Sequence, residues 1–183
     1  MEIVQTKIPG LLVIKPKIFA DDRGYFFESY NRNRFVEAGI PQVFVQDNES
    51  KSQKSVLRGL HFQNPPHSQG KLVRVIKGAV IDVAVDIRIG SPTYGQWEAI
   101  ELSETNKIMY WVPPGMAHGF VTLEDDTIFF YKCTDLYNQA SEGSIRWNDP
   151  QLNINWGIQN PVLSDKDKTA PLFKDFKSNF SYL

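Results

Sequence analysis

The sequence contains few of the features that mark secreted or membrane proteins. Cys133 is the single cysteine among 183 residues, so no disulfide can form within the chain, and a reducing compartment such as the cytoplasm is expected. The first residues show no charged segment followed by an apolar stretch, so no secretory signal is expected. No apolar run approaches the roughly 18 residues that a membrane-spanning helix requires, and we expect no membrane partner.

An excess of charge of one sign is also missing. Lys and Arg total 20 and Asp and Glu total 21, which gives a formal net charge of -1, and no basic block occurs. Proteins that bind nucleic acid carry a basic surface, so a nucleic-acid partner is not expected. Internal repeats and low-complexity segments are absent as well. Hydrophobic residues make up 42% of the chain, enough for the core of one domain spanning residues 1–183.

Most of the chain has the pattern of short β-strands separated by turns. Residues 80–88 alternate apolar side chains with polar or small ones, the period of two that is typical of a strand. Gly78 lies between this segment and residues 71–77, which predicts a β-hairpin. Many short strands at such spacing predict a sandwich or jelly roll. Strands are predicted at 56–63, 71–77, 80–88, 96–102, 107–112, 119–123 and 127–135.

Helix signals are few. A short helix is predicted over residues 31–38, capped by Asn31 and ended by Gly39. The tail from Ser164 onward is predicted to hold one or two more short helices, interrupted at Pro171. Residues 164–183 contain several large apolar side chains, so we expect this tail to pack on the β-structure or on a neighbouring subunit.

Charged and polar side chains occur inside the predicted strands. Burying charges against a closed apolar core would be costly without partners, whereas a barrel that encloses a ligand can have a polar inner face. The sequence therefore predicts a pocket inside the β-structure. The side chains that favour it are Arg58, His61, Lys71, Asp82, His118 and Tyr131.

The histidines number only three, and two of them lie in strand-like segments. In VLRGLHFQ (56–63), strand alternation places Gly59 and His61 on one face, and Gly59 leaves room for a group to approach the imidazole. A structural histidine is the alternative interpretation. In PPGMAHGF (113–120), the spacing P-x-G-x-x-H resembles the second motif of the cupin superfamily, a tight turn that delivers His118 onto the inner wall of a barrel.

A metal-binding cupin would need an H-x-H motif followed by a glutamate. The corresponding segment contains only His61, followed by Phe62 and Gln63. Too few ligands remain for a typical catalytic metal site, so we expect none.

Acid–base chemistry beside a ketone fits these residues better. His61 is suited to abstract a proton from carbon, and Lys71 or His118 could stabilise the resulting enolate. Tyr131 is a candidate acid for the opposite face, although a plain core aromatic is the alternative interpretation. A carboxylate should orient the histidine, and spacing alone does not rank the candidates, which are Asp82, Asp86, Asp165 and Asp167.

A series of motifs in order covers almost the whole chain. They are FADDRGYFFE (19–28), FVQDNES (44–50), VLRGLHFQ (56–63), QGKLVRV (69–75), VAVDIR (83–88), PPGMAHGF (113–120), YKCT (131–134), IRWNDP (145–150) and LSDKD (163–167). Together they resemble the dTDP-4-dehydrorhamnose 3,5-epimerase family of the dTDP-L-rhamnose pathway. The resemblance implies an all-β cupin-type jelly-roll barrel and cofactor-free inversion of dTDP-4-dehydro-6-deoxy-D-glucose at C3 and C5.

The resemblance also implies roles for individual residues. His61 would be the base, paired with Asp167, and Tyr131 the acid on the other side of the sugar ring. Lys71 would lie near the C4 oxygen and stabilise the enolate, while Tyr137 would stack on the thymine. The remaining pocket and substrate-binding residues would be Arg23, Glu28, Gln46, Asn48, Arg58, His118, Glu142 and Lys166.

The family resemblance further implies a homodimer in which an N-terminal strand crosses to the partner subunit. Arg23 and Glu28 would then serve the neighbouring pocket. Without the resemblance, these two residues and Glu142 would be interpreted as solvated surface charges. Three alternatives remain open from the sequence: an epimerase that inverts one carbon of a related sugar nucleotide, a sugar-binding cupin without catalysis, and a metal-dependent cupin.

Overall fold

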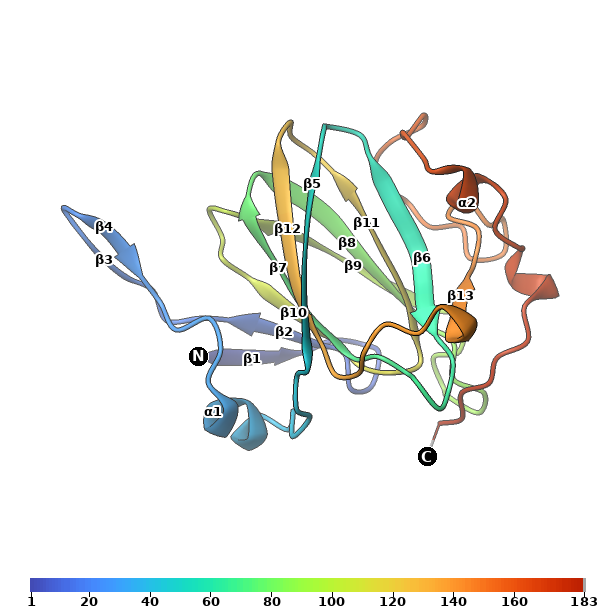
Figure 1. Ribbon diagram of the computed structural model, residues 1–183, viewed down its shortest axis with the longest axis horizontal. Helices are drawn as coiled ribbons and strands as arrows, with labels where there is room; N and C mark the ends of the chain where they lie inside the picture. The colour runs from blue at the N-terminus through green and yellow to red at the C-terminus, as the bar shows by residue number, and fades with distance from the viewer. Residues whose placement is uncertain (183) are drawn as a thin grey trace.

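The computed structural model describes residues 1–182 and contains two β-sheets that face each other, as in a jelly roll (Figure 1). This confirms the predicted all-β fold with few helices. The first sheet has the order β1 (Glu2–Gln5), β2 (Leu12–Lys15), β10 (Met109–Val112), β7 (Lys71–Lys77), β12 (Thr127–Cys133) and β5 (Gln46–Ser52). The second has the order β13 (Glu142–Ser144), β6 (Leu57–Gln63), β11 (Met116–Thr122), β8 (Ala79–Asp86) and β9 (Trp97–Ser103).

The helices are short and lie outside the sheets. The longer α-helix, α1 (Arg32–Glu37), begins after Asn31, whose side chain accepts hydrogen bonds from the backbone N–H groups of residues 33 and 34. The predicted cap is therefore confirmed. In the tail, α2 (Asp165–Lys168) begins after Ser164 in the same way, and the 3₁₀ turn η2 (Phe173–Asp175) follows it. A further 3₁₀ turn, η1 (Gln139–Ser141), precedes β13 and completes the set within residues 1–182.

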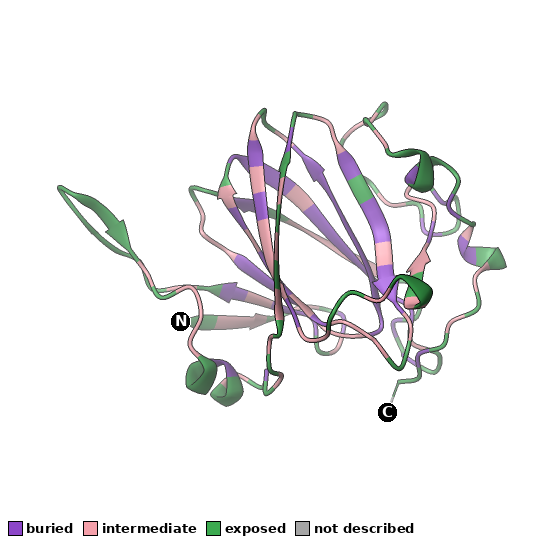
Figure 2. Cartoon of the chain, viewed as in Figure 1, coloured by how far each residue is buried: buried purple, intermediate pink, exposed green. Residues whose placement is uncertain are grey.

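Apolar side chains form three clusters that hold the layers together. One lies between the two sheets and includes Val73, Tyr110 and Phe129. A second covers the outer face of the second sheet, where the tail contributes Phe173 and Phe180. The third lies on the outer face of the first sheet, under α1. In Figure 2 the strands of both sheets are therefore mostly buried or intermediate, whereas the connecting loops are exposed.

The predicted hairpin of residues 71–77 and 80–88 is wrong. Strand β7 pairs with β10 and β12 in the first sheet, whereas β8 pairs with β9 and β11 in the second. Gly78 alone separates the two strands and has a φ of +78°. The tightest common hairpins need a two-residue loop, so this single residue instead turns the chain from one sheet into the other.

The sequence pattern also missed several strands, because they lack an apolar alternation. Strand β5 has the sequence QDNESKS and alternates between exposed and partly buried polar side chains. Strands β1 and β2 pair with each other, and β2 is joined to the first sheet through β10. A polar strand such as β5 is positioned by its neighbouring strand, β12, rather than by a hydrophobic period of its own.

Strand β6 is irregular where the catalytic candidate lies. His61 is paired with His118, and Arg58 with Phe120, so three positions on β6 match two on β11. This β-bulge interrupts the regular alternation of side chains along β6. The prediction that Gly59 and His61 share one face of the strand depended on that alternation. A Cβ atom on Gly59 would lie 2.6 Å from the Cα atom of Gly119. The absent side chain therefore makes room for strand β11, not for a ligand.

A hairpin of β3 (Phe19–Asp21) and β4 (Gly24–Phe26) extends away from the body of the protein (Figure 1). Both strands are exposed along their whole length (Figure 2). Phe19 and Phe26 are 54% and 70% exposed, which is unusual for such large apolar side chains. Among residues 1–182, no helix is long and apolar enough to cross a membrane.

We expect the tail to contribute strongly to stability. Phe173 is buried in the cluster on the second sheet, and its replacement in Phe173→Ala should lower the free energy of unfolding by about 3–5 kcal/mol. The half-exposed Val36 provides a control, because Val36→Ala should change stability by less than about 0.5 kcal/mol. Urea denaturation measures both. A Phe173→Ala protein as stable as the wild type would show that the tail is not part of the core.

Candidate active site

A cavity of about 440 Å³ opens between the two sheets. Its size falls within the range of small-molecule sites, roughly 300–1,000 Å³. The predicted pocket inside the β-structure is thus present. Six of the predicted site residues line it, and these are Arg58, His61, Lys71, His118, Tyr131 and Asp167.

His61 and Asp167 meet at this cavity although 106 positions separate them in the chain. The Nε2 atom of His61 lies 2.5 Å from Oδ1 of Asp167. Strand β6 supplies the histidine and helix α2 the carboxylate, whose other oxygen accepts a hydrogen bond of 2.8 Å from the Ser164 hydroxyl. The His61 side chain is 33% exposed and that of Asp167 3%, so the histidine faces the cavity and the carboxylate lies behind it.

The environment of Asp167 favours its ionised form. Burial acts to raise the pKa of the carboxyl group, but the hydrogen bond and charge of His61, together with Ser164 and Lys166, outweigh it. The pKa of Asp167 therefore lies below its ordinary value. An ionised carboxylate beside His61 fixes the orientation of the ring and stabilises it when it takes a proton.

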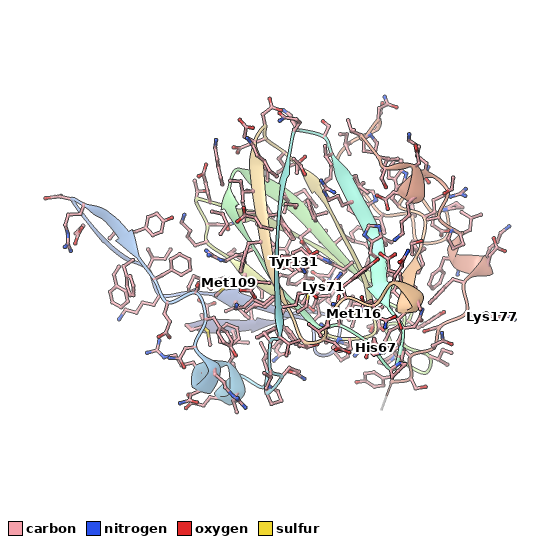
Figure 3. The ribbon with its side chains drawn as sticks, viewed as in Figure 1. His67, Lys71, Met109, Met116, Tyr131 and Lys177 are labelled. Atoms are coloured by element: carbon pink, nitrogen blue, oxygen red, sulfur yellow. The ribbon has the colours of Figure 1, made fainter. Side chains whose placement is uncertain are left out.

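Tyr131 and Lys71 project from the first sheet, on the wall that faces His61. The Lys71 ammonium lies 5.8 Å from the centre of the Tyr131 ring, and both side chains lie in the middle of the barrel (Figure 3). Burial lowers the pKa of Lys71, although the carboxylates of Asp82 and Glu142 oppose this. Burial also raises the pKa of Tyr131, so its phenol keeps its proton as a potential acid.

His118 and Arg58 complete the polar lining. The predicted turn delivers His118 onto strand β11, where its Nε2 lies 2.8 and 3.0 Å from the two oxygens of Asp82. The Arg58 guanidinium donates to the hydroxyl of Ser52 at 3.2 Å. The walls of the cavity therefore carry two cations, Arg58 and Lys71, well suited to an anionic ligand.

Gln46, Asn48 and Tyr137 lie outside this lining but are connected to one another. The Gln46 amide donates to Oδ1 of Asn48 at 3.1 Å, and its own Oε1 accepts from the backbone N–H of Tyr137 at 2.8 Å. The Tyr137 ring is 57% exposed. Because Gln46 binds the backbone of Tyr137 and not its side chain, the exposed ring has an aromatic face free for stacking.

Lys166 and Glu142 form an ion pair of 2.5 Å between helix α2 and strand β13. Neither residue lines the cavity. They nevertheless flank it, because Lys166 precedes Asp167 and strand β13 pairs with β6 along its edge. Half of the Lys166 side chain is exposed, so its ammonium can exchange this carboxylate for another anion.

Arg23 and Glu28 are not brought to the cavity of their own chain. Arg23 lies at the tip of the exposed hairpin, where it pairs with Asp21, and its side chain is 90% exposed. Glu28 pairs with Arg34 of helix α1 at 3.2 Å. Within a single chain, both residues are therefore ordinary surface charges.

The sequence did not reveal several residues of the cavity. Phe129 is one of them, and its ring stacks on that of Phe120 with ring centres 4.0 Å apart, so that the two rings form an apolar wall. Ser164 both caps helix α2 and binds Asp167, and the pattern Ser-x-x-Asp in LSDKD, typical of a helix N-terminus, could have predicted this. From residue 1 to residue 182, no three His, Cys, Asp or Glu side chains come close enough to hold a metal ion.

The low pKa of Asp167 predicts a pH-dependent contribution to stability. At pH 7, Asp167→Asn should lower the free energy of unfolding by about 1–3 kcal/mol, because a hydrogen bond to a charged group is weakened. The folded pKa lies below the unfolded value of about 3.9, so the contribution is complete above that pH and is lost as the pH falls through the folded pKa.

Urea denaturation at pH 7 and in acid measures this effect. The difference between wild type and Asp167→Asn should shrink in acid. Asp165 is the matched control, because it lies in the same helix with a side chain that is 98% exposed, and Asp165→Asn should have little effect. A difference for Asp167→Asn that is the same at both pH values would contradict this assignment.

Comparisons with known proteins agree with the geometry. The profile of the dTDP-4-dehydrorhamnose 3,5-epimerase family matches residues 5–175. The dTDP-4-dehydrorhamnose 3,5-epimerase of Salmonella typhimurium is 55% identical over 174 residues, which cover 94% of this chain and 95% of that protein.

Two solved structures are also similar. The dTDP-6-deoxy-D-glucose-3,5-epimerase of Legionella pneumophila, in complex with dTDP-4-keto-L-rhamnose, is 50% identical with a TM-score of 0.95, covering 100% of this chain and 98% of that one. ChmJ, a 3'-monoepimerase from Streptomyces bikiniensis in complex with dTDP-quinovose, is 34% identical with a TM-score of 0.87, covering 91% and 85%. The chain belongs to the dTDP-4-dehydrorhamnose 3,5-epimerase family.

Proposed function

We propose that the protein converts dTDP-4-dehydro-6-deoxy-D-glucose to dTDP-4-dehydro-L-rhamnose by inverting C3 and C5. The observation that carries the proposal is the placement of a histidine–carboxylate pair and a partly buried tyrosine on facing walls of one cavity. Inversion of carbon requires a base on one side and an acid on the other, and His61 and Tyr131 meet that requirement. The family of the chain and its 55% identity to a curated 3,5-epimerase support the choice of substrate.

The first step is proton abstraction next to the C4 ketone. His61 takes the proton from carbon, and the electron pair of the C–H bond moves to form an enolate with its charge on the C4 oxygen. Asp167 holds the ring in place and stabilises its positive charge. Lys71 stabilises the enolate oxygen, because a partly buried ammonium in the cavity wall interacts strongly with a developing anion.

The second step returns a proton to the opposite face of the same carbon. Tyr131 donates its phenolic proton, the enolate collapses to the ketone, and His61 then releases the proton it took while Tyr131 regains one from solvent. The oxidation state of the sugar is unchanged, so the reaction requires no redox cofactor. A second round at the other carbon next to the ketone completes the double inversion.

The remaining predicted residues are assigned to substrate binding. Arg58 and Lys166 offer donors to the sugar and the diphosphate, with Gln46, Asn48 and Glu142 beside them, and His118 lies beside the sugar. The exposed ring of Tyr137 can stack on the thymine. The single buried cysteine suits a reducing cytoplasm, where the substrate would be made.

The enzyme is proposed to act as a homodimer in which the β3–β4 hairpin reaches the partner subunit. The hairpin exposes Phe19, Tyr25 and Phe26, side chains that a partner surface would cover. It also carries Arg23, a cation far from the cavity of its own chain. In the dimer, Arg23 and Glu28 would reach the neighbouring cavity and help to bind the substrate.

Proton NMR in D₂O tests the reaction directly. With dTDP-4-dehydro-6-deoxy-D-glucose, the wild-type protein should exchange deuterium into both C3 and C5, and His61→Ala should slow this exchange about 10²- to 10⁴-fold, the usual contribution of a general base. Tyr131→Phe should retain exchange at carbon but lose inversion, because the base is intact and the acid is missing.

Each other result has a definite meaning. Exchange at a single carbon in the wild type would identify an epimerase of the 3'-monoepimerase kind. Binding of the nucleotide without any exchange would identify a sugar-binding protein, and activity that a chelator abolishes would identify a metal-dependent enzyme. Either of the last two results would refute the proposed mechanism.

Subunit complementation tests the exchanged hairpin. Arg23→Ala and His61→Ala should each lose most activity alone at limiting substrate. When the two variants are unfolded, mixed in equal amounts and refolded together, about a quarter of wild-type activity should return. This follows because half of the dimers are mixed, and one cavity of each mixed dimer has both residues. No recovery, from a mixture that contains mixed dimers, would show that Arg23 does not serve a neighbouring cavity.

A further inference from the structure

We propose that Asp82 is a positioning residue of the active site, which acts by holding His118 so that its Nδ1 atom faces the sugar. This inference rests on the proposed function, because it assigns a role in the same cavity. It adds a second histidine–carboxylate pair to the His61–Asp167 pair. The second pair is buried, and both of its residues lie on the sheet that carries His61.

The contact between the two residues is close and protected from solvent. Asp82 is 0% exposed and His118 6%. They lie on neighbouring strands, β8 and β11, where the register places Ala84 opposite His118 and Phe120 opposite Asp82. The two side chains are thus diagonal neighbours on the inner face of the sheet. An ionised carboxylate in such a place must have a hydrogen-bond donor, and His118 is the one the structure provides.

The geometry decides which nitrogen of His118 is available. An ionised carboxylate can only accept, so the hydrogen bonds of 2.8 and 3.0 Å to Asp82 require a proton on Nε2. The other nitrogen, Nδ1, makes no hydrogen bond with any residue in the range 1–182, and the ring lines the cavity. Nδ1 is therefore left for the substrate, as an acceptor in the neutral ring and as a donor to the C4 oxygen when the ring is doubly protonated.

Other charged and titratable groups also face Asp82. Its charge opposes the lowering of the Lys71 pKa by burial. Burial raises the pKa of Tyr110, and the charges of Asp82 and Glu98 add to that rise. The Tyr110 hydroxyl is buried and has no hydrogen-bond partner among the described residues. An effect of Asp82 through Lys71 is therefore the main competing explanation, and the experiment must separate it from an effect through His118.

Strand β8 offers a matched control. Asp86 lies four residues further along, on the same inner face, and is equally buried. Its carboxylate is bound by Arg88, Ser91 and Thr93, and it does not line the cavity. Asp86→Asn removes a buried charge from the same strand without touching His118.

The first test is the protonation of the His118 ring, measured by long-range ¹H–¹⁵N NMR with the signal assigned from His118→Ala. The wild type should show a proton on Nε2 that exchanges slowly with solvent. Asp82→Asn should lose that slow exchange, and Asp86→Asn should keep it. A His118 ring without a proton on Nε2 in the wild type would overturn the proposal, and this measurement does not depend on how well any Asp82 variant folds.

The second test is a double-mutant cycle on the deuterium exchange reaction. His118→Ala should lower kcat about 10²- to 10³-fold, as expected for loss of one group that stabilises an oxyanion. Asp82→Asn should lower kcat at least about tenfold with the wild-type His118 present, and by less than about twofold in the His118→Ala background. Equal effects in the two backgrounds would show that Asp82 acts through Lys71 or the fold, and would refute the inference.

The two tests also distinguish this inference from the proposed function. If the wild type catalyses no exchange, the proposed function fails, while the NMR signal of His118 still reports whether Asp82 fixes its ring. If the wild type catalyses exchange and the cycle is additive, the function stands and the role of Asp82 is refuted.

Discussion

The need to satisfy charged side chains inside a β-sandwich shapes the site. Cations and histidines on the inner faces would be costly in a closed apolar core, so each is paired or faces the cavity. The carboxylates of Asp82 and Asp167 each bind a histidine, and Arg58 binds Ser52. Apolar side chains such as Val73 and Val75 fill another part of the same interior. The interior of the barrel thus contains both a packed apolar core and a polar cavity.

The C-terminal tail connects stability to the proposed chemistry. Phe173 and Phe180 pack on the outer face of the second sheet and hold the tail in place. The same tail carries Asp167, which reaches His61 on strand β6 of that sheet. Ser164 begins helix α2 and also donates to Asp167, so a single hydroxyl both starts the helix and orients the carboxylate. A loosened tail would therefore remove Asp167 from His61.

The use of two facing sheets explains how so small a barrel can invert a carbon centre. His61 lies on one sheet and Tyr131 on the other, so a sugar ring between them would meet a different group on each face. A single sheet could not supply this arrangement, because all its inward side chains approach the substrate from the same side. The stacked rings of Phe120 and Phe129 add an apolar wall suited to a deoxy sugar.

The sequence by itself determined the local features, namely those that depend on residues close together in the chain. The strand pattern of residues 80–88, the cap at Asn31 and the turn before His118 all follow from local backbone preferences, and each is present. Tertiary structure alone decided the features that depend on contacts between distant segments. Strands β7 and β8 lie in different sheets, and Gly59 lies in a bulge beside Gly119. Tertiary structure also selected Asp167 from four carboxylates, because only packing of the tail brings that residue to His61 across 106 positions.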